Sequence, residues 1–170
     1  YGAEITLERT LQNGLYMLFT GSLFQSKYKG ADGIERNTRF NANYLFNTVS
    51  GKEWKVGKGK QNIISINMRF IVSGNNRFIP IDLEASRAAG EQVLDQNSIY
   101  EASLDDYMRV DFGIRYIKNR PKTTSIIALN VQNVTSRENE GGRFYSQEFN
   151  NVLSDTQLAL FPNLSYRLEF

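Results

Sequence analysis

The residues best suited to chemistry in this 170-residue chain are its paired carboxylates and a short glycine–lysine run. Asp105 and Asp106 are adjacent, so on a strand their side chains point to opposite faces and cannot share a proton. Asp82 and Glu84 can share a face, but no nucleophile accompanies them, and the chain has neither His nor Cys. Residues 57–60 (GKGK) lack the spacing of a phosphate-binding loop. We therefore expect no catalytic residues, no cofactor and no metal site, and a protein that is not an enzyme.

Aromatic side chains in two long polar stretches offer binding chemistry instead. The stretches are 74–106 and 137–156, and their aromatic residues include Tyr100, Phe144, Tyr145 and Phe149. Such rings can stack on a sugar or a siderophore, and binding concentrates on loops held by rigid strands. They can equally pin the two loops to one another, and we favour this second interpretation.

The elements that would carry these loops are long strands with alternating polar and apolar residues. Alternation predicts that one face of each strand is apolar. The cleanest runs are 38–47, 62–73, 107–118 and 163–170, and weaker ones are 1–11, 15–27, 77–83 and 123–136. Most reach ten residues, whereas ordinary strands average about 5–6 and a tilted membrane crossing takes about 9–11. The sequence predicts an all-β antiparallel meander of about seven or eight long strands.

The connections between these runs alternate in length. Residues 11–14, which contain Asn-Gly, and residues 118–122, which contain Pro121, read as short turns. The stretches 74–106, with a helical turn expected within 83–95, and 137–156 read as long loops, and 28–37 and 48–61 as intermediate ones. Outer-membrane barrels have short periplasmic turns on one rim and long external loops on the other. The chain follows this rule except at 48–61, and the rule places Phe170 at the periplasmic rim.

The chemistry of the two faces supports a transmembrane barrel. The apolar faces of the four best strands carry no charge, and a charge facing lipid at mid-membrane costs about 2–4 kcal/mol. The polar faces favour Arg and Asn, which can satisfy one another across a wet lumen. The candidate lumen-lining residues are Arg39, Asn41, Asn43, Asn67, Arg69, Arg109, Asp111, Arg115, Arg167 and Glu169. We expect most of them to form a structural network and not to contact a ligand.

The last strand has the strictest pattern. Its apolar face consists of Leu164, Tyr166, Leu168 and Phe170, and the sequence ends on that aromatic ring. An exposed aromatic ring at the end of the sequence is best explained if lipid or an assembly machine binds that ring. We therefore expect this strand to be the closing strand of an outer-membrane β-barrel.

The amino-acid composition excludes several other classes of protein. The net charge of +2 argues against a nucleic-acid partner, and the absence of Cys excludes disulfides. No apolar run approaches the roughly 20 residues of a transmembrane helix. No export signal precedes Tyr1, so we expect the sequence to be a mature chain or a fragment.

Several segments resemble the late barrel strands of TonB-dependent outer-membrane receptors, especially those typical of Bacteroidetes. They are YGAEI (1–5), GSLFQSKY (21–28), GIERNTRFN (33–41), PIDLEAS (80–86), NVQNVT (130–135) and NLSYRLEF (163–170). The resemblance covers nearly the whole chain, and each patch is moderately specific. It implies a 22-stranded barrel, plugged by an N-terminal domain, that imports a scarce nutrient such as a siderophore or carbohydrate.

The resemblance also implies where the chain belongs in such a receptor. With no plug and no energy-coupling box, residues 1–170 are expected to be one C-terminal segment of the barrel in the outer membrane of a Gram-negative cell. Its expected partners are outer-membrane lipid and the insertion machinery, which would read Leu164, Tyr166, Leu168 and Phe170 as an assembly signal. TonB would act only through N-terminal regions that this sequence lacks.

Two alternatives stay open. A soluble all-β ligand-binding module, lipocalin-like or sandwich-like, would turn the Ile64 to Val72 face inward and Arg69 outward. A complete small outer-membrane barrel would need one more strand, for which 77–83 is the candidate.

Overall fold

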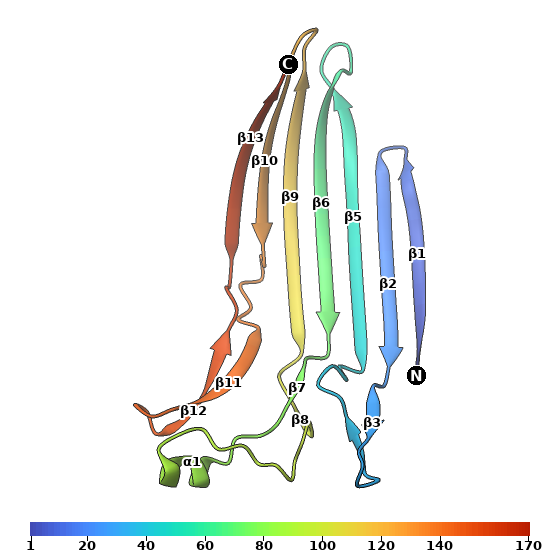
Figure 1. Cartoon of the computed structure of the whole chain (residues 1–170). Helices are drawn as coiled ribbons and strands as arrows, with labels where there is room; N and C mark the ends of the chain where they lie inside the picture. The colour runs from blue at the N-terminus through green and yellow to red at the C-terminus, as the bar shows by residue number, and fades with distance from the viewer.

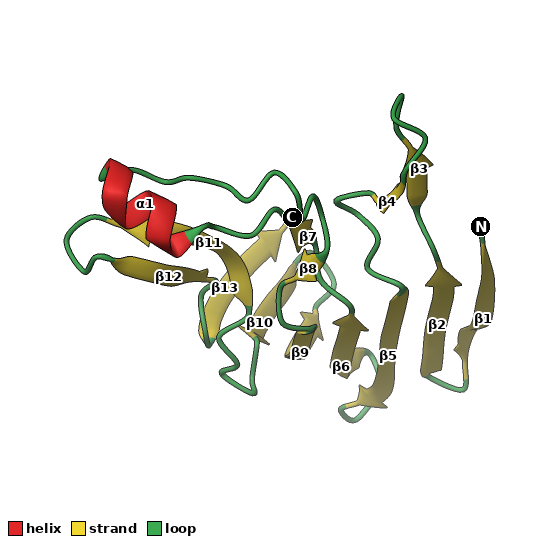
Figure 2. Ribbon diagram, turned by 90° about the horizontal axis from the view of Figure 1, so that it is seen from below, coloured by secondary structure: helices red, strands yellow, loops and turns green.

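The structure, a computed structural model of residues 1–170, is built around one seven-stranded antiparallel sheet (Figure 1). The strands are β1 (Gly2–Gln12), β2 (Leu15–Phe24), β5 (Tyr44–Val56), β6 (Asn62–Ser73), β9 (Tyr107–Asn119), β10 (Thr124–Gln132) and β13 (Phe161–Glu169). Each pairs with the main-sheet strand that precedes or follows it along the chain, so the predicted meander of long strands is confirmed. The sheet is curved and does not close, which leaves β1 and β13 as its edges (Figure 2).

Short and long connections lie at opposite ends of the sheet. Tight turns join β1 to β2, β5 to β6 and β9 to β10, and the C-terminus lies at the same end (Figure 1). The three connections at the other end each contain smaller elements. These are β3 (Lys27–Lys29) and β4 (Glu35–Asn37), then β7 (Arg77–Phe78), α1 (Leu83–Ala89) and β8 (Ala102–Ser103), then β11 (Glu140–Ser146) and β12 (Asn151–Thr156). The predicted alternation of short and long connections is confirmed.

The helical turn expected within 83–95 is also confirmed. Asp82 caps α1, because its Oδ1 accepts a hydrogen bond from Ala85 N at 2.9 Å. Gly90 ends the helix at a φ of 72°, a left-handed conformation that favours glycine. The chain has no helix that is both long and apolar enough to span a membrane.

The predicted bounds of one strand are wrong at both ends. Residues 38–43 are irregular, because Asn43 adopts a φ of 69° and Ala42 N donates to Phe40 O at 2.8 Å. The strand begins at Tyr44 and continues through Trp54, which pairs with Ile64, to Val56. The connection to β6 is therefore a tight turn, and the exception to the connection rule disappears. The candidate strand at 77–83 shrinks to β7, which pairs only with β8 outside the main sheet.

The strand register gathers apolar side chains on one face of the sheet. Met68 lies opposite Phe112, which lies opposite Val131, and Leu129 lies opposite Leu164. Residues directly opposite one another share a face, so this stripe crosses the sheet. The charged residues on this face are Arg9, Lys52 and Lys118, which all lie toward the short-turn end. Lys118 is an exception to the prediction that the apolar faces of the four best strands carry no charge.

Burial in this structure is the reverse of that in a soluble domain. Among the 11 buried residues the one large hydrophobic side chain is Leu104, and seven are polar or charged. The apolar side chains Met68, Phe112 and Leu168 are 44%, 40% and 40% exposed. No second layer covers the apolar face. A lipocalin-like or sandwich-like core requires such a layer, because its apolar side chains pack against a facing sheet.

Candidate functional site

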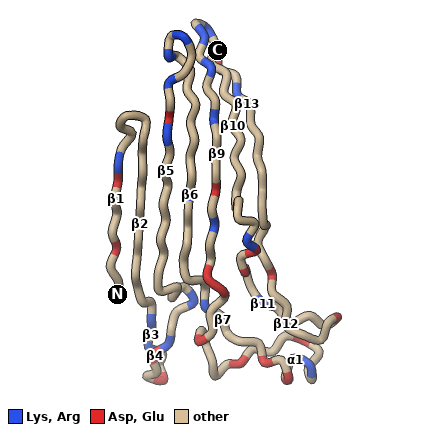
Figure 3. The backbone as a smooth tube through the Cα atoms, turned by 180° about the vertical axis from the view of Figure 1, so that it is seen from behind, with Lys and Arg blue, Asp and Glu red and all other residues tan.

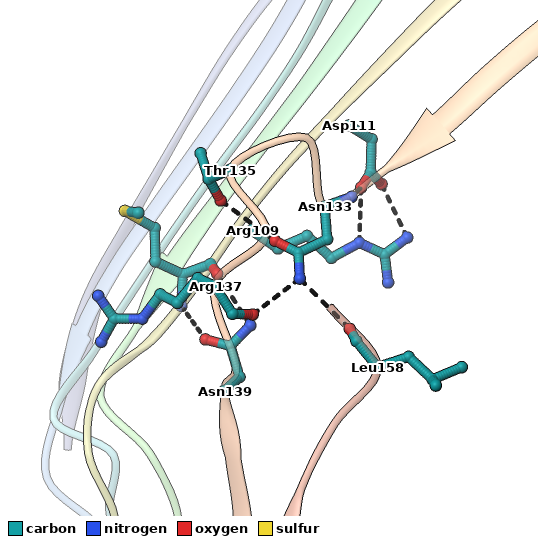
Figure 4. Close-up of polar contacts among 8 residues, drawn as sticks. Arg109, Asp111, Asn133, Thr135, Arg137, Asn139 and Leu158 are labelled. Atoms are coloured by element: carbon teal, nitrogen blue, oxygen red, sulfur yellow. Dashed lines mark hydrogen bonds and ion pairs between the residues drawn. The ribbon is translucent and has the colours of Figure 1, made fainter. Parts of the chain in front are cut away.

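The polar face of β6 and β9 brings together several of the predicted lumen-lining residues. Arg69 lies directly opposite Asp111, and Asn67 lies opposite Gly113. Arg109 donates from Nε and Nη2 to the two carboxylate oxygens of Asp111, at 2.6 and 2.9 Å (Figure 4). The two planar groups match, so this pair is more specific than a single contact.

A second ion pair links this face to β5. Arg115 Nη2 lies 3.1 Å from Glu53 Oε1, across β6. Sequence reasoning missed Glu53 because it placed residue 53 in a loop and not in β5. Arg167 and Glu169 form a looser pair of their own on β13, at 3.6 Å.

Close packing on the polar face depends on glycines. A Cβ at Gly113 would lie 2.6 Å from Asn130 Oδ1 and 2.7 Å from Asn67 Oδ1. A Cβ at Gly51 would lie 2.4 Å from the Tyr16 hydroxyl oxygen. The Tyr16 ring therefore lies over a position that only glycine leaves free.

Three predicted lumen-lining residues lie off the main strands, in the segment before β5. Asn41, 2% exposed, receives a hydrogen bond from Ser26 N at 2.8 Å and donates to Asn37 Oδ1 at 2.7 Å. Asn43 Oδ1 accepts from Arg77 at 3.4 Å. The Arg39 guanidinium makes no hydrogen bond or ion pair, and Arg39 is one of the residues that line a cavity among the long connections.

Two buried asparagines fasten the connection after β10 to the sheet (Figure 4). Asn139, 2% exposed, donates to Met108 O and accepts from Met108 N, both at 2.9 Å, so its amide substitutes for a paired strand residue. Asn133, 3% exposed, donates from its side chain to Arg137 O at 2.8 Å, and its backbone N donates to Asp111 at 2.9 Å. Neither asparagine was predicted as a site residue, although Asn133 stands in a segment that carries the family resemblance.

Glu140, 7% exposed, joins two long connections. Its carboxylate accepts from Arg143 Nε at 2.6 Å, Ser154 Oγ at 2.7 Å and Asp105 N at 3.1 Å. The hydrogen bond from Arg143, with further ones from Ser154 and the Asp105 backbone, lowers the pKa of Glu140 to about 2 against the opposing effect of burial. The ionised form therefore stabilises the folded state.

The low pKa of Glu140 predicts an acid-labile connection. Because the folded pKa is depressed, this stability is fully present above about pH 4.5 and is lost as the pH falls toward 2. We expect at most about 3 kcal/mol of protection against hydrogen exchange in 133–160 to disappear over that range. Glu140→Gln should flatten the pH dependence. An unchanged pH profile in that variant would contradict the assignment.

The two longest connections are held to one another by polar contacts, and none of the four predicted aromatic residues takes part in an aromatic stacking pair. Arg87 Nε donates to Asn150 O at 3.1 Å, and Tyr145 N donates to Gln92 Oε1 at 3.1 Å. The Gln147 amide also donates to Gly90 O. The stacked or tilted aromatic pairs of the chain lie instead among Phe19, Tyr44 and Phe46 on the apolar face.

The four predicted assembly-signal residues are displayed along the edge strand β13. Leu164, Tyr166, Leu168 and Phe170 are 74%, 64%, 40% and 98% exposed. At the short-turn end, where Phe170 lies, two of the three turns have basic tips (Figure 3). The β5–β6 turn carries Lys58 and Lys60, and the β9–β10 turn carries Arg120 and Lys122.

No protein-family model, curated protein or solved structure matches this chain. The geometry of its two faces and its two ends is therefore what a functional proposal depends on.

Proposed function

We propose that this chain is the C-terminal barrel region of a TonB-dependent outer-membrane receptor that takes up a nutrient such as a siderophore or carbohydrate. The observation that carries the proposal is the distribution of exposure. The apolar stripe across seven strands of 9 to 13 residues is uncovered, whereas the buried residues are mostly polar. Lipid is the environment in which such a surface is stable.

Strand parity supports a barrel larger than the sheet itself. β1 and β13 both run from the long-connection end to the short-turn end, because the sheet has an odd number of strands. Their free edges therefore cannot pair antiparallel with each other. Closure of an all-antiparallel barrel needs an odd number of further strands, and the 22 strands of the family that the sequence resembles meet this condition. A complete small barrel built from this chain alone would need one further strand in the main sheet. β7 does not supply that strand, because it pairs with β8 outside the main sheet.

The two ends suggest an orientation. Short turns and the C-terminal residue would face the periplasm, where the insertion machinery would read the β13 pattern, and the long connections would face outward. The Arg109–Asp111 and Arg115–Glu53 pairs would line the lumen. TonB would act through a plug and coupling segment from elsewhere in the receptor.

The single tryptophan provides a direct test. Trp54 is 42% exposed and lies opposite Ile64 on the apolar face, near the short turn between β5 and β6. In vesicles of lipids brominated on their acyl chains, we expect strong quenching of Trp54 fluorescence, because bromine quenches only rings that it can approach.

The matched control moves the tryptophan to the polar face. In the double variant Trp54→Phe, Tyr16→Trp the ring would lie over Gly51, on the face of the Arg109–Asp111 pair. We expect little quenching there. Equal quenching at both positions, or recovery of the chain as a stable monomer without detergent, would refute a lipid-facing apolar stripe.

A further inference from the structure

The long connections border an open cavity of about 280 Å³ whose wall combines arginines with apolar side chains. We propose that this cavity binds a small organic anion, a carboxylate on a compact apolar body. This inference deepens the proposed function. It rests on that function because the proposed orientation decides from which side the ligand reaches the cavity. The volume of the cavity lies just below the range for small-molecule sites, about 300–1,000 Å³, so the ligand must be small.

The cavity lies between segments far apart in the sequence. Arg39 comes from the segment before β5, Arg77 and Tyr100 from the connection between β6 and β9, and Gly142 and Arg143 from β11. Hydrogen bonds fix these segments against one another, such as Arg77 N to Arg39 O at 2.8 Å and Asn75 Nδ2 to Glu140 O at 3.0 Å. The cavity is therefore part of the folded connections and not a gap at the edge of one loop.

The charge of the cavity wall is positive. Arg143 is neutralised by Glu140, but Arg39 and Arg77 have no carboxylate partner, and no Asp or Glu lines the cavity. The Arg77 guanidinium donates to carbonyl oxygens, including Glu101 O at 2.9 Å and Asn41 O at 3.1 Å. Arg39 donates to nothing, so its full guanidinium fork is free for an anion.

Two further residues of the cavity wall carry unpaired donors. Tyr100 and Asn76 are also lining residues, and the side chain of neither makes a hydrogen bond within the chain. Tyr100 adopts a φ of 57°, which is uncommon for a bulky residue and is the kind of strain that functional sites retain.

The rest of the wall selects the body of the ligand. Phe78, Ile81, Leu94 and Leu104 supply apolar surface, and Leu104 is the buried hydrophobic residue of the chain. The Arg143 guanidinium lies 5.2 Å from the centre of the Phe78 ring, which holds that wall in place. An inorganic anion could use Arg39 but would leave this surface wet, so we expect an organic acid to bind more tightly than phosphate.

The test uses 4-fluorobenzoate as a probe, followed by its ¹⁹F signal, on the full chain in detergent micelles. We expect saturable binding with a Kd of about 1 mM or tighter. The neutral analogue 4-fluorobenzamide, which lacks the charge, and inorganic phosphate, which lacks the apolar body, should both bind at least about tenfold more weakly.

Three variants locate the site. Arg39→Gln should weaken binding about tenfold or more, and it should fold normally because only the backbone of residue 39 is engaged. Gly142→Leu should block binding, because Gly142 lines the cavity and a leucine side chain there would take up part of its volume. The variant should fold normally, because a Cβ at Gly142 meets nothing within 4 Å. Arg120→Gln, at the opposite end of the sheet, should bind normally.

Two results would overturn the proposal: no saturable binding of 4-fluorobenzoate, or binding that survives both Arg39→Gln and Gly142→Leu. Failure here is distinct from failure of the proposed function. The latter shows as absent quenching of Trp54 by brominated lipid, a measurement that does not involve this cavity.

Discussion

Leu129→Arg is expected to lower the free energy of unfolding in lipid vesicles by about 2–4 kcal/mol. Leu129 lies in the middle of β10, is 40% exposed, and has Ile114 and Leu164 directly opposite it on the neighbouring strands. Under the proposed function, a guanidinium there would face acyl chains with no counter-charge in reach. Urea-induced unfolding from vesicles, followed by fluorescence, measures the loss.

The adjacent residue provides the control for this prediction. Asn130 is exposed on the polar face, beside Gly113, so Asn130→Arg adds the same charge to the opposite side of the sheet. We expect a smaller loss than for Leu129→Arg, because the added guanidinium stays in polar surroundings. A larger loss from Asn130→Arg than from Leu129→Arg would mean that the sheet faces are the other way round.

The strands and the connection pattern could be predicted because they depend on local information. Side chains on a strand alternate between faces with a period of two, so a stretch such as 62–73 indicates its own structure and its own apolar face. The Asn13-Gly14 turn is equally local, and both residues adopt positive φ, as such turns require.

The failures came where local pattern and long-range pairing disagree. Residues 38–43 alternate in the sequence but form no strand, because their polar groups bond to other connections, as Asn41 does to Ser26. Residues 50–56 lack alternation, yet they belong to β5 because β6 pairs with them throughout. Alternation therefore identifies a strand only when a neighbouring strand accepts its backbone groups.

The polar sites were only partly predictable for the same reason. The residue types on the polar face indicated a network, but its partners depend on register. Arg115 reaches Glu53 from 62 residues away, and no spacing rule anticipates that distance. Asn139 and Glu140 are two of many polar residues in a long connection, and only the assembled fold shows that both are buried.

The second large effect is expected at one of these unpredicted residues. Asn139→Leu removes both partners of the Met108 backbone, the donor to its carbonyl and the acceptor from its N–H. Each buried backbone group left unsatisfied costs about 1–3 kcal/mol. We expect the connection between β10 and β13 to detach from β9, with faster hydrogen exchange at the Met108 amide and a lower free energy of unfolding.

The same change at an exposed asparagine separates this clamp from a general effect of losing an amide. Asn163 lies on the polar face of β13, and its side chain makes no hydrogen bond within the chain, so Asn163→Leu should leave exchange at Met108 unaltered. The exchange pattern is the sharper readout, because the Met108 amide donates to the Asn139 side chain and not to a neighbouring strand. If Met108 stays protected in Asn139→Leu, the connection is held to the sheet chiefly by Asn133 and Glu140. The buried amide at 139 would then contribute little to holding the long connections in place.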